Sequence, residues 1–95
     1  MIRTFKDKES EKIYFREYSK ILPSDIQQIA LRKLRMISRS VNLNDLRVPP
    51  ANRLEKLRGK REGQYSIRIN EQWRICFEWH GSDAFEVEIV DYHKG

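Results

Sequence analysis

The chain has 95 residues, which is enough for one domain with a modest hydrophobic core. Hydrophobic residues make up 39% and charged residues 35%, which excludes an intrinsically disordered chain, and no apolar run reaches membrane-spanning length. The net charge of +5 indicates a polyanionic partner, which would be nucleic acid, an acidic protein or an anionic membrane surface.

Two features are typical of a cytoplasmic protein. The first ten residues are charged instead of apolar, so no signal peptide is indicated. Cys76 is the only cysteine, which excludes an internal disulfide and a cysteine-rich metal site. Because Cys76 lies in the middle of a predicted strand, we expect it to be a small packing residue.

The N-terminal part of the chain predicts a short strand and two helices. Ile2 to Phe5 could form the strand, and Lys8 to Tyr18 has an imperfect apolar stripe of helical spacing. A second helix is predicted from Ser24 to about Arg39, because Ser24 and Gln27 have the spacing of a capping box. Its apolar stripe consists of Ile26, Ile29, Ala30, Leu34, Ile37 and Val41. The other side is interpreted as a solvated face or as a contact with RNA or an acidic partner, and it carries Gln27, Gln28, Arg32, Lys33, Arg35 and Arg39.

Three runs of alternating apolar and polar residues follow an irregular stretch from Asn42 to Asn52. The runs extend from Tyr65 to Ile69, from Trp73 to Trp79 and from Phe85 to Asp91. Alternation with period two is typical of half-buried strands, and the short connections predict an antiparallel meander. The residues expected on the buried face are Tyr65, Ile67, Ile69, Trp73, Ile75, Phe77, Trp79, Phe85, Val87 and Ile89.

The connection between the first two runs sets the strand register. A three-residue loop from Asn70 to Gln72 places Ile67 opposite Ile75 and keeps the apolar residues on one face. The same register puts Arg68 opposite Arg74, where like charges are unfavourable unless an anion such as a phosphate lies between them. The alternative is that both arginines extend into water or pair with glutamates of the sheet, which are Glu78, Glu86 and Glu88.

These elements predict a single domain of the α+β class over residues 1–95. A small antiparallel sheet of about four strands would carry the two N-terminal helices on its apolar face. The opposite face is then expected to be free. It would carry Gln64, Ser66, Arg68, Arg74, Cys76, Glu78, Glu86, Glu88 and Tyr92.

A basic segment lies just before the three runs. Between positions 53 and 61 there are five cations and one acid, and Gly59 and Gly63 make the segment flexible or tightly turned. Five cations in nine residues is a phosphate-binding pattern, and the segment leads into the strand that carries Arg68. The expected RNA-binding residues are Arg53, Lys56, Lys60, Arg61 and Arg68, with Arg58 in the same segment. The alternative is a segment that only increases solubility.

Metal-free cleavage of RNA is the chemistry that these residues allow. His93 follows the last predicted strand and the pair Asp91-Tyr92, and imidazole is the side chain whose proton moves most readily near neutral pH. His80 is expected in a surface turn, and no third ligand for a metal is placed beside Asp91 and His93. In RNA the 2′-hydroxyl can attack its own phosphate, so the protein needs only a base, an acid and cations on the phosphate.

The second half of the chain contains, in this order, the segments Asn52 to Gly59 (NRLEKLRG), Arg61 to Arg68 (REGQYSIR), Trp73 to Phe77 (WRICF) and Val90 to His93 (VDYH). In this combination they resemble HigB-type toxins of the RelE-like superfamily of bacterial toxin–antitoxin systems. The resemblance implies a RelE-like fold and a ribosome-dependent endoribonuclease that cuts messenger RNA in the ribosomal A site, without a cofactor. It also implies the partners: a helix-turn-helix antitoxin of the HigA type, the 70S ribosome and mRNA, with operator DNA bound only through the antitoxin.

The family's functional positions can be located in this chain. Its basic residue before the loop glycine corresponds to Arg58, and its sheet arginine corresponds to Arg74. The resemblance implies that both stabilise charge on the scissile phosphate.

The C-terminal triplet of the family corresponds to Asp91, Tyr92 and His93. The resemblance implies that His93 is a general acid or base, that Tyr92 stacks on or orients the RNA, and that Asp91 positions the C-terminal turn. Some members carry a histidine three residues before Arg58, where this chain has Glu55, so His93 is the only nearby imidazole. Two alternatives to an enzyme remain: a non-catalytic RNA-binding module, and a protein whose basic surface binds an acidic partner.

Overall fold

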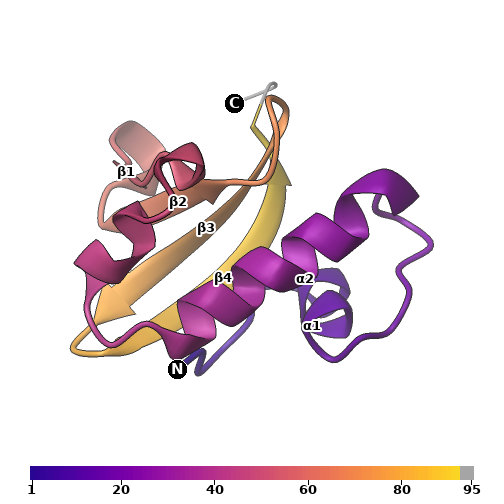
Figure 1. Cartoon of the computed structure of the whole chain (residues 1–95), viewed down its shortest axis with the longest axis horizontal. Coiled ribbons are helices and arrows are strands. Elements are labelled where there is room, and N and C mark those ends of the chain that lie inside the picture. Colours follow the sequence, from indigo (N-terminus) through magenta and orange to yellow (C-terminus); the bar gives the residue numbers. More distant parts are fainter. Residues whose placement is uncertain (93–95) are drawn as a thin grey trace.

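The computed structural model describes residues 1–92 as two α-helices and a four-stranded sheet (Figure 1). The helices are α1 (Lys8–Tyr14) and α2 (Ser24–Arg39). The strands are β1 (Glu55–Lys56), β2 (Gln64–Arg68), β3 (Trp73–His80) and β4 (Asp83–Asp91), antiparallel in the order β1-β2-β3-β4. Three short 3₁₀ helices are η1 (Leu43–Arg47), η2 (Pro50–Asn52) and η3 (Gly59–Arg61). The predicted α+β class is confirmed. Within residues 1–92, no helix is long and apolar enough to span a membrane.

The register between β2 and β3 is the predicted one. Ile67 lies opposite Ile75, and Arg68 lies opposite Arg74. The loop of residues 70–72 is held by Asn70, whose side-chain oxygen accepts hydrogen bonds from the backbone N–H groups at positions 72 and 73, over 2.8 and 2.7 Å. An asparagine that satisfies two loop amides in this way fixes the turn and therefore the register.

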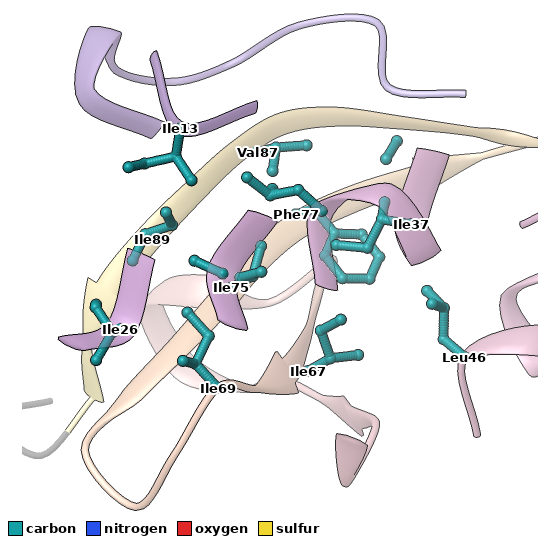
Figure 2. Close-up of a cluster of buried hydrophobic side chains, with 13 residues drawn as sticks. Ile13, Ile26, Ile37, Leu46, Ile67, Ile69, Ile75, Phe77, Val87 and Ile89 are labelled. Atoms are coloured by element: carbon teal, nitrogen blue, oxygen red, sulfur yellow. The ribbon is translucent and has the colours of Figure 1, made fainter. Parts of the chain in front are cut away.

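The helices cover the apolar face of the sheet, and the core lies between these two layers (Figure 2). The core residues are Ile13 of α1, Ile26, Ala30, Leu34 and Ile37 of α2, Leu46, and Ile67, Ile69, Ile75, Phe77, Ala84, Val87 and Ile89 of the sheet. Each is at most 7% exposed, and burying a large apolar side chain stabilises the fold by about 1.5–3 kcal/mol. Val41 was predicted on the same stripe but is 62% exposed, because α2 ends at Arg39.

A β-bulge in β4 reverses the expected orientation of Phe85. Phe85 pairs with Glu78, so β4 contains one residue more than β3 between this pair and the next. Glu86 takes the extra place with a φ of 53°, in the left-handed region. The insertion turns Phe85 onto the polar face and brings Ala84 into the core instead. The prediction of a buried-face Phe85 is therefore wrong, since strict alternation does not reveal a bulge.

The first helix is shorter than predicted. Its N-terminus is capped by Asp7, whose Oδ1 accepts a hydrogen bond from the Ser10 N–H over 2.7 Å. It ends at Tyr14 instead of Tyr18, and Arg16 then adopts a left-handed φ of 65°, which directs the chain away from the helix axis.

The capping box predicted at Ser24 does not form. Pro23 is the N-cap of α2, and it makes no side-chain hydrogen bond. Gln27 is buried and holds the connection between the helices: its amide group donates to the carbonyls of Ser19 and Leu22 over 2.8 and 2.9 Å. Its Oε1 accepts from the Ser19 N–H over 3.0 Å, so Gln27 is not part of a solvated face.

Residues 2–5 do not form a separate strand but lie along the outer edge of β4. Ile2 and Phe5 make isolated parallel bridges with Ala84 and Val87. Between the two bridges, the N–H of the bulge residue donates to the Thr4 hydroxyl over 2.8 Å. The bulge therefore explains why pairing along this edge is interrupted.

Asn52 holds the irregular segment that precedes β1 against α2. Its buried side chain donates to the carbonyls of Leu46 and Val48 over 3.1 and 3.3 Å, and its Oδ1 accepts a hydrogen bond from the Lys33 ammonium. Lys33 was predicted on the polar side of α2 but is only 8% exposed. Burial, together with the nearby charge of Arg32, lowers the pKa of Lys33.

Candidate functional site

The face of the sheet opposite the helices carries a row of polar residues across all four strands. Paired in turn from β1 to β4 are Glu55, Ser66, Cys76 and Glu88. Residues that pair across antiparallel strands point to the same side, so these side chains share one face. Ser66 and Cys76 are fully buried. The centre of this face is therefore buried, and not exposed to solvent as predicted.

Arg74 is a buried cation on this face and is 6% exposed. Its Nε donates to Ser66 Oγ over 2.8 Å, its Nη2 donates to the Arg53 carbonyl over 2.5 Å, and its Nη1 lies 3.1 Å from Glu55 Oε1. The ring of Tyr92 lies against the guanidinium, with 5.4 Å between Cζ and the ring centroid, in a cation–π contact. A buried guanidinium requires partners for its donors, so these contacts tie β1 to β2 and β3.

The Arg68–Arg74 pair is stabilised by carboxylates of the protein. Arg74 is paired with Glu55, and Arg68 Nη2 lies 3.8 Å from Oε1 of Glu71 in the loop between β2 and β3. The alternative that glutamates neutralise these arginines is therefore favoured. However, the partners are Glu55 and Glu71, not the glutamates of β3 and β4 that the strand pattern indicated.

The C-terminal end of β4 is fixed to the loop of residues 70–72. Asp91 pairs with Trp73 and shares its side of the sheet, and Gln72 Nε2 donates to Asp91 Oδ2 over 2.9 Å. The Tyr92 N–H donates to the Gln72 carbonyl over 2.7 Å, which holds the Tyr92 ring on the polar face. His93 lies outside the described residues, so its role stays a prediction.

One cation of the basic segment, Arg61, contacts residues of β2 and β4. Arg61 Nη1 lies 3.0 Å from Glu88 Oε2 and donates to Gln64 Oε1 over 3.1 Å. The hydrogen bond with Glu88 raises the pKa of Arg61. Lys6 Nζ lies 3.4 Å from the same Glu88 oxygen. Sequence reasoning missed Lys6, because its position depends on the N-terminal segment lying along β4.

Other cations of the segment are available to a ligand. Arg53, Arg58 and Lys60 are exposed, and none of them forms an ion pair with another residue in positions 1–92. Arg58 comes directly before Gly59, whose φ of 66° a glycine adopts without strain. Lys56 is also exposed, but it pairs with Tyr65 and so lies on the opposite side of β1 from Glu55. The structure therefore separates Lys56 and Arg61 from the group of available cations.

Cys76 and His80 are not candidates for a catalytic role beside the available cations Arg53, Arg58 and Lys60. Burial raises the pKa of the Cys76 thiol to about 11, so the thiol is protonated at neutral pH and is not a nucleophile. His80 is the exposed last residue of β3, and its Nε2 lies 3.2 Å from Glu78 Oε1. Among the described residues, no group of three or more side chains is arranged to hold a metal ion.

Comparison with known proteins identifies relatives over nearly the whole chain. The family described as RelE-like toxin of type II toxin-antitoxin system HigB matches residues 3–93. The chain is 38% identical over 95 residues to Toxin HigB-1 of Vibrio cholerae, with 99% of each chain covered. It is 31% identical over 94 residues to Endoribonuclease HigB of Proteus vulgaris, with 98% of this chain and 100% of the relative covered. These matches confirm the resemblance that the sequence motifs indicated.

Proposed function

Since the chain belongs to the HigB-like family of RelE-like toxins of type II toxin–antitoxin systems, we propose that it is an endoribonuclease that cleaves messenger RNA. The name of the Proteus vulgaris relative, Endoribonuclease HigB, supports this reaction type. In this proposal, cleavage takes place in the A site of the 70S ribosome in the cytoplasm, needs no metal or cofactor, and inhibits translation.

A toxin of a type II system has an antitoxin as its partner. We propose that this antitoxin has a helix-turn-helix domain of the HigA type. The toxin would then reach operator DNA only through the antitoxin.

The observation that carries the proposal is the group of exposed cations within residues 53–60, the segment that contains β1. Arg53, Arg58 and Lys60 are exposed, and Arg53 is joined through its carbonyl to Arg74. Cations on an exposed segment are suited to the RNA backbone, and an aromatic ring such as that of Tyr92 is suited to stacking on a base.

The proposed reaction is attack of the 2′-oxygen on the neighbouring phosphorus, with loss of the 5′-oxygen of the next nucleotide. Arg58 contacts the phosphate directly and stabilises the charge that develops on it. Arg74 also stabilises the charge on the phosphate, and its contacts with Ser66, the Arg53 carbonyl and Glu55 keep β1 in place. His93 transfers a proton as general acid or base, and Asp91 holds the end of β4 on the loop of residues 70–72.

Controlled expression in a bacterium, followed by mapping of mRNA ends, tests the proposal. The expected result is growth arrest with new 5′ ends that fall in phase with codons and disappear when the start codon of a reporter transcript is removed. In vitro, cleavage should persist in a chelator at a concentration that leaves the ribosomes intact. Growth arrest with intact transcripts would contradict the proposal.

One observation favours a second function, that of a non-catalytic RNA-binding module. The guanidinium of Arg74 donates to protein groups at Ser66 and Arg53 and pairs with Glu55, so it does not need a phosphate. A binding module would associate with programmed ribosomes and block translation without producing new mRNA ends. The same mapping experiment therefore distinguishes the two functions.

A further inference from the structure

Arg61 connects the loop between β1 and β2 to the far side of the sheet. Among the side chains of residues 58–63, it alone makes a hydrogen bond or an ion pair with another residue of positions 1–92. Its Nη1 donates to Gln64 Oε1 over 3.1 Å, at the start of β2, and lies 3.0 Å from Glu88 Oε2, two strands away on β4. The contact with Glu88 therefore holds this loop against the polar face of the sheet.

The short helix η3 links the position of Arg61 to that of Arg58. The Arg61 N–H donates to the Arg58 carbonyl over 3.3 Å. At the base of the loop, the Leu57 N–H donates to the Gln64 carbonyl over 2.8 Å, and Leu57 is buried. The base is thus fixed by the hairpin itself, whereas the position of Arg58 and its neighbours also depends on where the Arg61 side chain is held.

Glu88 is suited to hold Arg61 because its own position does not depend on the loop. It lies within β4, and its side chain is 12% exposed. The oxygen that contacts Arg61 also lies 3.4 Å from Lys6 Nζ, and the Lys6 N–H donates to the Val87 carbonyl over 2.9 Å. Partly buried ion pairs of this kind are screened by salt less than exposed ones.

The charge of Glu88 alone would oppose RNA binding. RNA is a polyanion, and its affinity for a protein comes largely from the cations that contact its phosphates. A carboxylate that holds a cation-bearing loop in place can still favour binding, if ordering the loop contributes more than the charge costs. The two effects of Glu88 therefore have opposite signs and can be separated.

We propose that Glu88 is a positioning residue for RNA binding by this toxin. Through Arg61 it holds the loop of residues 58–63 on the sheet, so that Arg58 and Lys60 are presented together to the RNA backbone. The inference rests on the proposed function, because it assigns a task to the segment that would bind mRNA. Arg61, which the sequence indicated as an RNA-binding residue, then acts through the loop and not by contact with a phosphate.

The test measures single-turnover mRNA cleavage on programmed ribosomes at increasing toxin concentrations. Glu88→Gln keeps the shape of the side chain and raises the net charge by one from +5, so charge alone would tighten binding. We expect the opposite. The toxin concentration for half-maximal rate should rise about tenfold, as for a loop that is correctly placed about one-tenth of the time. The maximal rate should stay within about threefold, because bound RNA restores the loop.

Two further variants separate positioning from direct contact. Arg61→Gln should also weaken binding about tenfold, and the double variant with Glu88→Gln should bind no more weakly than Arg61→Gln, because the two residues form one contact. Lys6→Gln is the matched control, since Lys6 contacts the same Glu88 oxygen from the N-terminal segment. It should bind within about threefold of the wild type, as expected for the loss of a mostly exposed ion pair.

NMR order parameters of the backbone amides give a second measurement that does not depend on RNA. In Glu88→Gln, the values for residues 59–62 should fall below about 0.6, while those of β2 and β3 stay near about 0.85. If Glu88→Gln does not fold, Arg61→Gln provides the same comparison, because it leaves Glu88 paired with Lys6.

Several results would overturn the inference. Tighter or unchanged binding by Glu88→Gln would show that Glu88 does not position the loop, and so would unchanged order parameters in residues 59–62. Losses that multiply to about 100-fold in the double variant would show that Arg61 and Glu88 act separately. A loss in Lys6→Gln equal to that in Glu88→Gln would assign the effect to the N-terminal segment. If the wild type itself neither binds nor cleaves ribosome-bound mRNA, the proposed function fails together with this inference.

Discussion

Substituting Arg74 should destabilise the protein far more than substituting any exposed cation of the basic segment. Arg74→Ala removes hydrogen bonds to Ser66 Oγ and to the Arg53 carbonyl and the ion pair with Glu55. Loss of one member of a buried, hydrogen-bonded charge cluster costs about 3–5 kcal/mol. Because Glu55 is half exposed and can be rehydrated, we expect the lower end, about 3 kcal/mol. For a domain of this size the melting temperature should fall by about 12–24 °C.

The assay is thermal unfolding followed by circular dichroism, with Arg58→Ala as the matched control. Arg58 is exposed and makes no ion pair within residues 1–92, so its removal should change stability by no more than about 0.5 kcal/mol. Cleavage should fall by about 10²-fold for both variants, measured at a temperature where Arg74→Ala is still folded. An Arg74→Ala protein that melts within about 4 °C of the wild type would refute the argument that the contacts of buried Arg74 stabilise the fold.

Three further predictions concern other parts of the molecule. His93→Gln should leave melting temperature and antitoxin binding unchanged and lower cleavage by about 10²-fold; wild-type cleavage by this variant would remove His93 from the mechanism. Asn52→Ala should lower the free energy of unfolding by about 3 kcal/mol, measured by chemical denaturation, because it leaves the Lys33 ammonium buried without its partner. Adding Lys33→Met to the Asn52→Ala protein should restore part of this loss. Equal stability of the wild type, Asn52→Ala and the double variant would contradict the argument. Cys76 has a pKa raised to about 11, so the unfolded chain loses its thiol proton first and stability should decline from about pH 8.5 upwards. Cys76→Ala should lack that part of the decline, and an unchanged alkaline profile would show that the thiol is not responsible.

The parts of the fold that sequence predicted correctly are those with a strong local pattern. The alternation of β2 and β3 and the polar loop between them fixed the pairing of Ile67 with Ile75. The bulge at Glu86 was not predictable, because a left-handed conformation at a residue other than glycine leaves no signal in the apolar pattern. Lys33 shows a different limit: helical spacing assigned it to the polar side, but its long side chain reaches a buried asparagine.

The sequence identified residues of the candidate site, but it did not predict which of them contact one another. Arg58 and Arg74 were identified by motif, and the exposed position of Arg58 agrees with a direct contact to RNA. The pairing of Arg74 with Glu55 could not be read from the sequence, because β1 has only two residues and therefore no alternation. Tertiary pairing decides which cations in such a basic segment are structural and which are exposed.

The lateral pairing of residues 2–5 with β4 has a consequence for solubility. An unpaired strand edge presents a row of N–H and C=O groups that can recruit a strand from another molecule and begin aggregation. In residues 1–92, one edge of the sheet is the two-residue β1, and the other is occupied by the N-terminal bridges and by the Ser10 hydroxyl, which accepts a hydrogen bond from the Ile89 N–H over 2.8 Å. The N-terminal segment therefore covers the outer edge of the longest strand of the sheet, and its removal should expose β4 to pairing with other molecules.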